Sequence, residues 1–318
     1  MSDFRLMLAA RVFPPIRIDP RPSHIVHTYV YLLAILHRCR EVITDICLKM
    51  ETGMADFAHR AATSTTAPYL TSIEEYDLYC HYVAGLVGEG LSRLFAATKK
   101  ERPWIADQLV LSNSMGLLLQ KTNILRDFRE DCDEGRYFWP REIWGAYGFS
   151  KPEEMRAAGG EAQKRAMWAL SHMTLNALGH VVDGLDYLKM LQNQSVFNFV
   201  AIPATMAIAT LALCFMNAEV FQRNVKIRKG QAVKVCGQTH FNASFTEGLL
   251  QLIMHSNNPH TVAYIFRDYA RAIHKKAVPA DPNYLRICVV CGKVGSYLPS
   301  VSRPTCSFLS QRTDPRLG

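Results

Sequence analysis

The stretch of sequence that decides the fold reads Gln120-Lys-Thr-Asn-Ile-Leu-Arg-Asp-Phe-Arg-Glu-Asp-Cys-Asp-Glu-Gly-Arg-Tyr-Phe-Trp-Pro140. Its first half contains no glycine or proline and continues an apolar helical pattern from the residues before it. Asp127 and Asp131 are four residues apart, so on an α-helix both carboxylates face the same way. Gln120 and Asn123 fall on the same stripe. The stretch therefore predicts a helix with one polar, acidic face.

The acidic face of this stretch has two interpretations. Two like charges one helical turn apart repel each other by roughly 0.2–0.5 kcal/mol, and a bound cation turns that cost into binding. Magnesium is usually held by one or two carboxylates together with substrate phosphates. Arg126, Arg129 and Arg136 lie in the same segment, and an anionic ligand would account for both signs of charge. The alternative is a solvated acidic helix face, and the residues alone leave both open.

The length, charge and cysteine content of the chain indicate which kind of protein it is. The 318 residues are 49% hydrophobic, which is enough for a large core. The net charge of +8 is scattered along the chain. It fits anionic ligands or a membrane surface, and no nucleic-acid motif is present, so we expect no nucleic-acid partner. Nine irregularly spaced cysteines without a secretory signal indicate reduced thiols in a cytosol-facing protein.

The apolar pattern is helical along the whole chain, without strand alternation or an internal repeat. The fold class is therefore predicted to be all-α, in one domain. The run Val196–Met216 is long enough to cross a membrane, but Asn198 and Pro203 interrupt it, and we interpret it as a buried helix pair. The expected helices are Glu41–Ala61, from the capping box at Ser72 to Ala97, Asp107–Asp133, Glu153–Leu191 with breaks near Gly159 and Gly184, Gln194–Ala218, Asn258–Lys276, and one after Pro282.

Three further clusters are ambiguous on the residues alone. Gly85, Gly88 and Gly90 follow Tyr82, and glycine costs about 1 kcal/mol inside a helix. They indicate close approach by a ligand or by another helix. Phe197 and Phe199 have a spacing typical of a core. The basic cluster Lys226, Arg228 and Lys229 is either a solvated face or an anion site.

Four long segments, in a fixed order, closely resemble motifs of the squalene synthases, head-to-head prenyl transferases of the squalene/phytoene synthase family. They are Tyr79-Cys-His-Tyr-Val-Ala-Gly-Leu-Val-Gly88, the stretch Gln120–Pro140, Asn193-Gln-Ser-Val-Phe-Asn-Phe199 and Lys226-Ile-Arg-Lys-Gly-Gln-Ala-Val233. The resemblance runs from about Glu41 to Val235 and resumes from about Leu252 to Lys293. It does not cover the two ends.

The resemblance implies a single isoprenoid-synthase-like helical domain with a central cavity. The implied reaction joins two farnesyl diphosphates into presqualene diphosphate and reduces it with NADPH to squalene, in sterol biosynthesis. The implied cofactors are Mg²⁺ and NADPH. It also implies a monomer on the cytosolic face of the endoplasmic reticulum membrane.

The resemblance also assigns roles to individual residues. Tyr82 matches a tyrosine that handles a proton in the first half-reaction, and the aromatic motif lines the pocket where a carbocation is reduced. The implied sites are metal binding by Asp127 and Asp131, diphosphate binding by Gln120, Arg126 and Arg136, NADPH binding by Asn123, Lys226 and Arg228, and catalysis by Tyr82, Phe197 and Phe199.

Some segments depart from the family pattern. We divide the chain into a non-family segment 1–39, a family domain 40–294 with an apparent insertion at 236–251, and an irregular tail 295–318. Family members carry two aspartate-rich motifs, whereas Asp-x-x-Glu-Asp occurs here once, and the tail shows no apolar anchor. This leaves a second hypothesis, a non-catalytic protein that binds prenyl diphosphate or a partner. A phytoene-synthase-like enzyme without a reductase step fits less well, because the basic motif is retained.

Overall fold

The computed structural model describes residues 22–63, 70–227 and 259–297. Every regular element in these ranges is helical, so the predicted all-α class is confirmed. The longer helices are α2 (Pro22–Thr63), α3 (Ile73–Cys80), α4 (Leu86–Ala97), α5 (Leu109–Arg126), α8 (Gly160–Leu178), α9 (Val181–Met190), α10 (Gln194–Cys214), α13 (Pro259–Lys276) and α14 (Tyr284–Ser296). The shorter ones are the π-helix η1 (His81–Gly85), η2 (Pro103–Asp107), α6 (Phe128–Asp133), α7 (Arg141–Ala146), η3 (Pro152–Arg156) and η4 (Ala218–Phe221).

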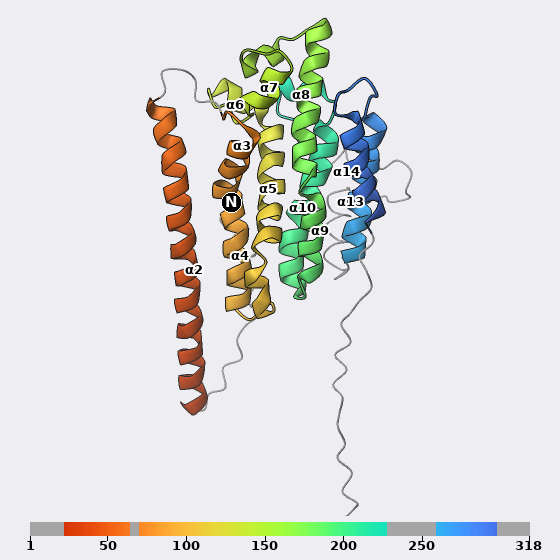
Figure 1. Ribbon diagram of the computed structural model, residues 1–318. Helices are drawn as coiled ribbons and strands as arrows, with labels where there is room; N and C mark the ends of the chain where they lie inside the picture. The colour runs from red at the N-terminus through yellow and green to blue at the C-terminus, as the bar shows by residue number, and fades with distance from the viewer. Residues whose placement is uncertain (1–21, 64–69, 228–258, 298–318) are drawn as a thin grey trace, which may run out of the picture.

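Helix α5 lies at the centre of the bundle (Figure 1) and packs against η1, α4, α8, α9 and α10. The long helix α2 stands at one flank against α4 and η1, and α13 and α14 cover the opposite side of α9 and α10. The acidic stretch begins on α5, so it starts from the most enclosed element of the fold.

Helix α10 supplies much of the core. It is a single helix rather than the predicted pair, because Pro203 is accommodated inside it. Among the described residues it is the one helix long and apolar enough to cross a membrane, and 67% of its most apolar window is buried within the bundle. The burial of this segment follows the prediction, while its division in two was wrong.

The capping box at Ser72 forms in part. Ser72 Oγ accepts a hydrogen bond from the backbone N–H of Glu75 at 3.2 Å, which starts α3 as predicted. The Glu75 carboxylate does not return to Ser72 but accepts from the backbone and side chain of Thr71, at 2.5 and 2.7 Å. In a standard capping box the Glu75 carboxylate would accept from the backbone N–H of Ser72. Here it binds Thr71, the residue before Ser72, instead.

Several helix boundaries differ from the prediction. The helix expected over Asp107–Asp133 breaks at Asp127, whose backbone leaves the helical region at φ −93° and ψ 9°. The second break expected near Gly184 occurs instead at Gly179–His180, and Gly184 lies inside α9. Two further differences are α7, which forms between Asp133 and Glu153 where no helix was expected, and α2, which begins at Pro22 instead of near Glu41.

The three glycines after Tyr82 serve helix contacts. A Cβ on Gly85 would collide with the side chain of Asn113, and one on Gly88 with the backbone carbonyl of Ser112, both on α5. A Cβ on Gly90 would stand 3.0 Å from the side chain of Ile46 on α2. Of the two predicted explanations, the approach of neighbouring helices is confirmed. The insertion at 236–251 and residues 298–318 of the tail lie outside the described residues.

Candidate functional site

The two aspartates of the acidic motif remain one turn apart despite the break between α5 and α6. The backbone N–H of Asp127 donates to the carbonyl of Asn123 at 2.9 Å, and that of Asp131 donates to the carbonyl of Asp127 at 2.9 Å. The i to i−4 ladder therefore continues through the junction. Gln120 is half-buried and Asn123 exposed on the preceding turns.

Both arginines that were predicted to bind diphosphate lie beside these carboxylates. Arg126 Nε and Nη2 donate to the two oxygens of Asp127 at 2.8 and 2.6 Å. Arg136 Nη2 and Nε donate to Asp131 Oδ1 at 2.8 and 3.2 Å. Each pair sets a fork of N–H donors next to an acceptor, the geometry that arginine also uses for phosphate. The segment thus presents both signs of charge within one small region.

Asp131 is the more enclosed of the two acids, with 9% of its surface exposed. Burial raises the pKa of its carboxyl, and the neighbouring Arg136 offsets part of that increase. Within the described residues, no three His, Cys, Asp or Glu side chains are placed to hold a metal ion together. Two carboxylates suit Mg²⁺ nonetheless, since it keeps several waters and takes substrate phosphate oxygens.

Sequence reasoning missed Asn224. Its Nδ2 donates to Asp127 Oδ1 at 2.9 Å and to Glu130 Oε2 at 2.6 Å. This bond draws the chain just before Lys226 against the acidic motif, and Lys226 itself is exposed two residues further on. The predicted NADPH residue Arg228 lies outside the described residues. No spacing in the sequence pointed to Asn224, because the contact joins positions about a hundred residues apart.

Tyr79 is a second residue that the sequence did not single out. Its ring stacks on Phe138 with centroids 5.1 Å apart, and it meets Phe57 of α2 edge-on at 5.3 Å. Burial raises the pKa of the Tyr79 phenol to about 12, and the charge of Asp131 adds to the increase. An aromatic wall therefore connects α2 and α3 with the acidic motif.

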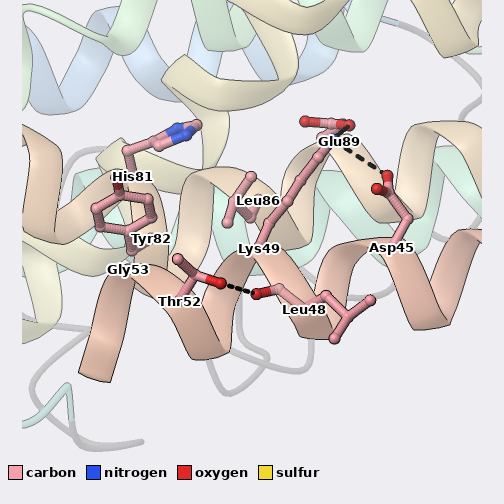
Figure 2. Close-up of a pocket in the computed structure, with 9 residues that line it drawn as sticks. All are labelled: Asp45, Leu48, Lys49, Thr52, Gly53, His81, Tyr82, Leu86 and Glu89. Atoms are coloured by element: carbon pink, nitrogen blue, oxygen red, sulfur yellow. Dashed lines mark hydrogen bonds and ion pairs between the residues drawn. The ribbon is translucent and has the colours of Figure 1, made fainter. Parts of the chain in front are cut away.

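Tyr82 lies in the π-helical turn η1, between α2 and α5. The ring of Tyr82 rests on α2 beside Gly53, while the side chain of the neighbouring His81 points away from α2 (Figure 2). The Nδ1 atom of His81 lies 2.7 Å from Asn113 Oδ1 on α5. Tyr82 lines an open groove of about 470 Å³ along α2. The charged side of that groove is a network in which Lys49 bridges Asp45 and Glu89 at 3.1 and 2.9 Å. Single π-helical turns occur often at functional sites.

A separate apolar cavity of about 160 Å³ runs between η1, α4, α5 and α10. Phe199 lies at this cavity, is 44% exposed, and meets Phe95 edge-on at 6.2 Å. Phe197 is fully buried in the core and does not line the cavity. The other lining residues are Val83, Ala84, Val87, Gly88, Leu91, Ser112, Met115, Gly116, Leu119, Tyr187, Val200 and Pro203.

The structure thus brings some predicted residues together and separates others. The aspartates, Arg126 and Arg136 form one polar site at the end of α5, and Phe199 faces an apolar cavity on the middle of the same helix. Tyr82 faces the neighbouring groove on α2, although Val83 and Ala84 beside it line the apolar cavity. Helix α5 is therefore the element that connects the polar and apolar parts of the candidate site.

The sequence is similar to known proteins of one family. The family model described as Squalene/phytoene synthase matches residues 18–231, so the match begins ahead of the motifs quoted above. The chain is 53% identical over 265 residues to a squalene synthase of Ganoderma lucidum, with 80% of this chain and 52% of the relative covered. It is 49% identical over 255 residues to the squalene synthase of Schizosaccharomyces pombe, with 80% of this chain and 51% of the relative covered. The squalene synthase of Mus musculus is 41% identical over 282 residues, covering 87% and 59%.

A solved structure shows the same fold. The complex of TcSQS with the ligand E5700 superimposes with a TM-score of 0.67 at 36% sequence identity, covering 80% of this chain and 67% of that one. The chain spans about half the length of the curated relatives that it matches.

Proposed function

Because this chain belongs to the squalene/phytoene synthase family, we propose that it carries out the squalene synthase reaction. In this reaction two molecules of farnesyl diphosphate are joined head to head to presqualene diphosphate, which NADPH then reduces to squalene in sterol biosynthesis. The observation that carries the proposal is the arrangement on α5. The paired-carboxylate and arginine site begins at the end of this helix, and an apolar cavity lies along its middle, as a ligand with a charged head and a hydrocarbon tail requires.

Asp127 and Asp131 would hold Mg²⁺, and Arg126, Arg136 and Gln120 would bind the diphosphate. The bound metal would neutralise the charge of the leaving diphosphate. Arg126 and Arg136 are already oriented by their carboxylate partners, so little side-chain freedom is lost when they turn to phosphate oxygens. The N–H forks of these arginines would hold the diphosphate at the end of α5.

The apolar cavity would receive part of the farnesyl chain. Its volume of about 160 Å³ is below the ~300 Å³ at which ligand pockets usually begin, so the side chains around it would have to move apart on binding. Its lining keeps water away from a carbocation, which water would otherwise convert to an alcohol. Phe199 and Phe95 would place aromatic faces near the cation, each worth about 0.5–2 kcal/mol.

Tyr82 would hold or pass on a proton in the first condensation, where its phenol can also face a cation. Lys226, Arg228 and Asn123 would bind NADPH, with the two cations on its phosphate. The contact between Asn224 and the acidic motif supports a shared site, since it brings the backbone before Lys226 to Asp127. We propose that the protein acts at the cytosolic face of the endoplasmic reticulum membrane, into which the apolar product squalene would pass.

The test is to incubate the purified 318-residue chain with radiolabelled farnesyl diphosphate, Mg²⁺ and NADPH, and to separate the products by chromatography. We expect squalene, and presqualene diphosphate when NADPH is omitted. The Asp127→Asn variant should form neither at a comparable rate. Equal product formation without Mg²⁺ would contradict the proposal.

A second candidate is binding of prenyl diphosphate without turnover. It is favoured by the single Asp-x-x-Glu-Asp motif in this sequence. Calorimetry separates the two functions. Mg²⁺-dependent binding of farnesyl diphosphate with no product would favour this second candidate, and absence of binding would exclude both.

A further inference from the structure

We propose that two copies of the chain pair through the outer face of helix α2, which runs antiparallel to the α2 of the second copy. The contact is an interaction surface, so it does not rest on the proposed function. A dimer of this kind differs from the monomer that the family resemblance implies.

Helix α2 has an inner and an outer face. Val42, Ile46 and Gly53 of the inner face are buried. In Figure 1 the helix stands at the flank of the bundle, and its N-terminal turns extend past the ends of α3 and α4. The outer face carries four large apolar side chains that are between 47% and 63% exposed, namely Leu33, Leu36, Ile43 and Leu48. With 3.6 residues per turn they lie within an arc of about 140°, and a row of this kind marks an interaction surface more often than single exposed leucines do.

Two exposed charges, Arg40 and Glu51, lie at the centre of this arc. Three of the four carboxylates of α2 lie within 3.5 Å of a basic side chain one helical turn away. Glu51 is the fourth, and it forms no ion pair with any described residue, nor does Arg40. The outer face therefore suits a partner that offers the opposite charges at the same spacing.

A second copy of α2 offers these charges when it runs antiparallel. If Arg40 faces Glu51 of the second copy, residues whose numbers add up to 91 lie opposite one another along the contact, and the two-fold axis repeats the ion pair. A parallel copy in register would instead place Arg40 against Arg40. The charges thus select one direction and one register.

The same register brings the apolar side chains of the outer face together. Next to the two-fold axis it places Ile43 opposite Leu48 of the second copy. Toward the ends it places a large side chain opposite a small exposed one, with Leu36 facing Ala55 and Leu33 facing Ala58. Large side chains opposite small ones let two helices interdigitate, so one alignment satisfies both packing and charge.

The contact is long but narrow. From Leu33 to Ala58 the helix rises about 38 Å. Each copy contributes about eight residues, where a standard interface uses about 20–30. We therefore expect a weak dimer, which forms at roughly tens of micromolar and dissociates below about 1 µM.

Analytical ultracentrifugation of the 318-residue chain at about 1 and about 100 µM tests for this dimer. We expect the mass of one chain at the lower concentration and nearly twice that mass at the upper one. Leu36→Glu should remain a monomer at both, because it places a charge in the apolar contact. The matched control Leu285→Glu adds the same charge at a 75% exposed leucine of α14 and should dimerise like the parent. A parent that stays monomeric, or a Leu36→Glu variant that still dimerises, would overturn the proposal.

A charge swap tests the register. Arg40→Glu and Glu51→Arg each place like charges opposite one another at two symmetry-related points, so each should raise the dissociation constant about fivefold or more. The double variant Arg40→Glu with Glu51→Arg restores opposite charges and should return the constant to within about twofold of the parent. Circular dichroism should be the same in all three, since both side chains are exposed. No recovery in the double variant would overturn the antiparallel register.

A lipid surface is the other occupant that an exposed apolar helix face could have. Flotation with vesicles of phosphatidylcholine and phosphatidylserine tests for it. If the parent stays monomeric at about 100 µM and floats with the vesicles while Leu36→Glu does not, the outer face binds lipid and the proposal is overturned. Dimerisation that Leu36→Glu abolishes and the charge swap restores supports the second copy as the occupant, whatever the flotation result.

Discussion

At the scale of single residues, the candidate site depends on a few side chains that hydrogen-bond to one another. Asp127 accepts from Arg126 and Asn224, and Asp131 accepts from Arg136. The two aspartates could be predicted from their spacing of four along a helix. Asn224 could not be predicted, because its amide reaches Asp127 only through a contact between distant parts of the chain.

Replacing Asp127 tests the polar site directly. We expect Asp127→Asn to weaken Mg²⁺-dependent binding of farnesyl diphosphate by at least about tenfold, since a charge-assisted ligand is lost. Helix content by circular dichroism should not change. Asp133→Asn is the control on the same short helix, because Asp133 pairs with Arg129 and Arg156 at its outer side. Equal affinities in Asp127→Asn and the parent, measured by titration calorimetry, would remove Asp127 from the site.

Asn224 offers a prediction that does not depend on catalysis. In Asn224→Asp a third carboxylate would replace the amide that bridges Asp127 and Glu130. Repulsion among the three acids should lower the melting temperature in EDTA, and added Mg²⁺ should raise it more than in the parent. The control Asn217→Asp keeps the acceptor for the backbone N–H of Glu219 and, like Asn224→Asp, loses an amide donor, here the one to the carbonyl of Leu213. An identical Mg²⁺ response in Asn224→Asp and the parent would rule out metal binding beside Asn224.

At the scale of elements, charged groups in the interior hold the helices around α5 in register. Lys121, with 1% of its surface exposed, lies 2.6 Å from Asp77 Oδ1 on α3 and 2.8 Å from His180 Nε2, just before α9. Burial is the main cause that lowers the pKa of His180, to about 3, and the charge of Lys121 adds to it. His180 is therefore neutral in the folded protein and accepts the hydrogen bond from Lys121.

The neutral state of His180 makes the fold sensitive to acid. Its pKa is below the ordinary 6.5, so the unfolded chain takes up a proton first and stability falls as the pH drops from 6.5 toward 3. Between pH 6.5 and 4.5 this single group would cost up to about 2.7 kcal/mol, at 1.36 kcal/mol per pH unit. We expect the free energy of unfolding of His180→Gln, measured with urea, to fall less over this range than that of the parent. His59→Gln, at an exposed site on α2, should follow the parent, and a parallel slope for His180→Gln would contradict the prediction.

At the scale of the whole molecule, the most apolar segment is in the middle of the bundle. Helix α10 packs against α5, α9 and α13, and Lys276 of α13 donates to the carbonyl of Ala212 at 2.6 Å near its end. The apolar surface of a helix that is buried in this way is already removed from water, so insertion into a lipid bilayer would stabilise it little further.

The burial of α10 leads to a prediction for membrane fractionation. We expect the 318-residue chain, expressed in cells, to be released from membranes by an alkaline carbonate wash, because α10 is not available to span the bilayer. Immunoblotting of the two fractions measures this. A chain truncated before Pro259, which would uncover the α13 side of α10, should shift toward the pellet. Retention of the full chain in the pellet would show that some segment inserts.

The sequence by itself determined the all-α class, the main helices of the bundle, and the acidic motif with arginines in the same segment. These follow from local periodicity and spacing, which a helix converts directly into shared faces. It did not determine the break at Asp127, the π-helical turn at Tyr82, or whether a ligand or a helix approaches the three glycines after Tyr82. Those features depend on which helix lies opposite, and only the tertiary structure brings Asn224 to Asp127 and Gly53 under Tyr82. The physical reason is that backbone hydrogen bonding within a helix is decided by residues four apart, whereas close packing is decided between residues far apart in the chain.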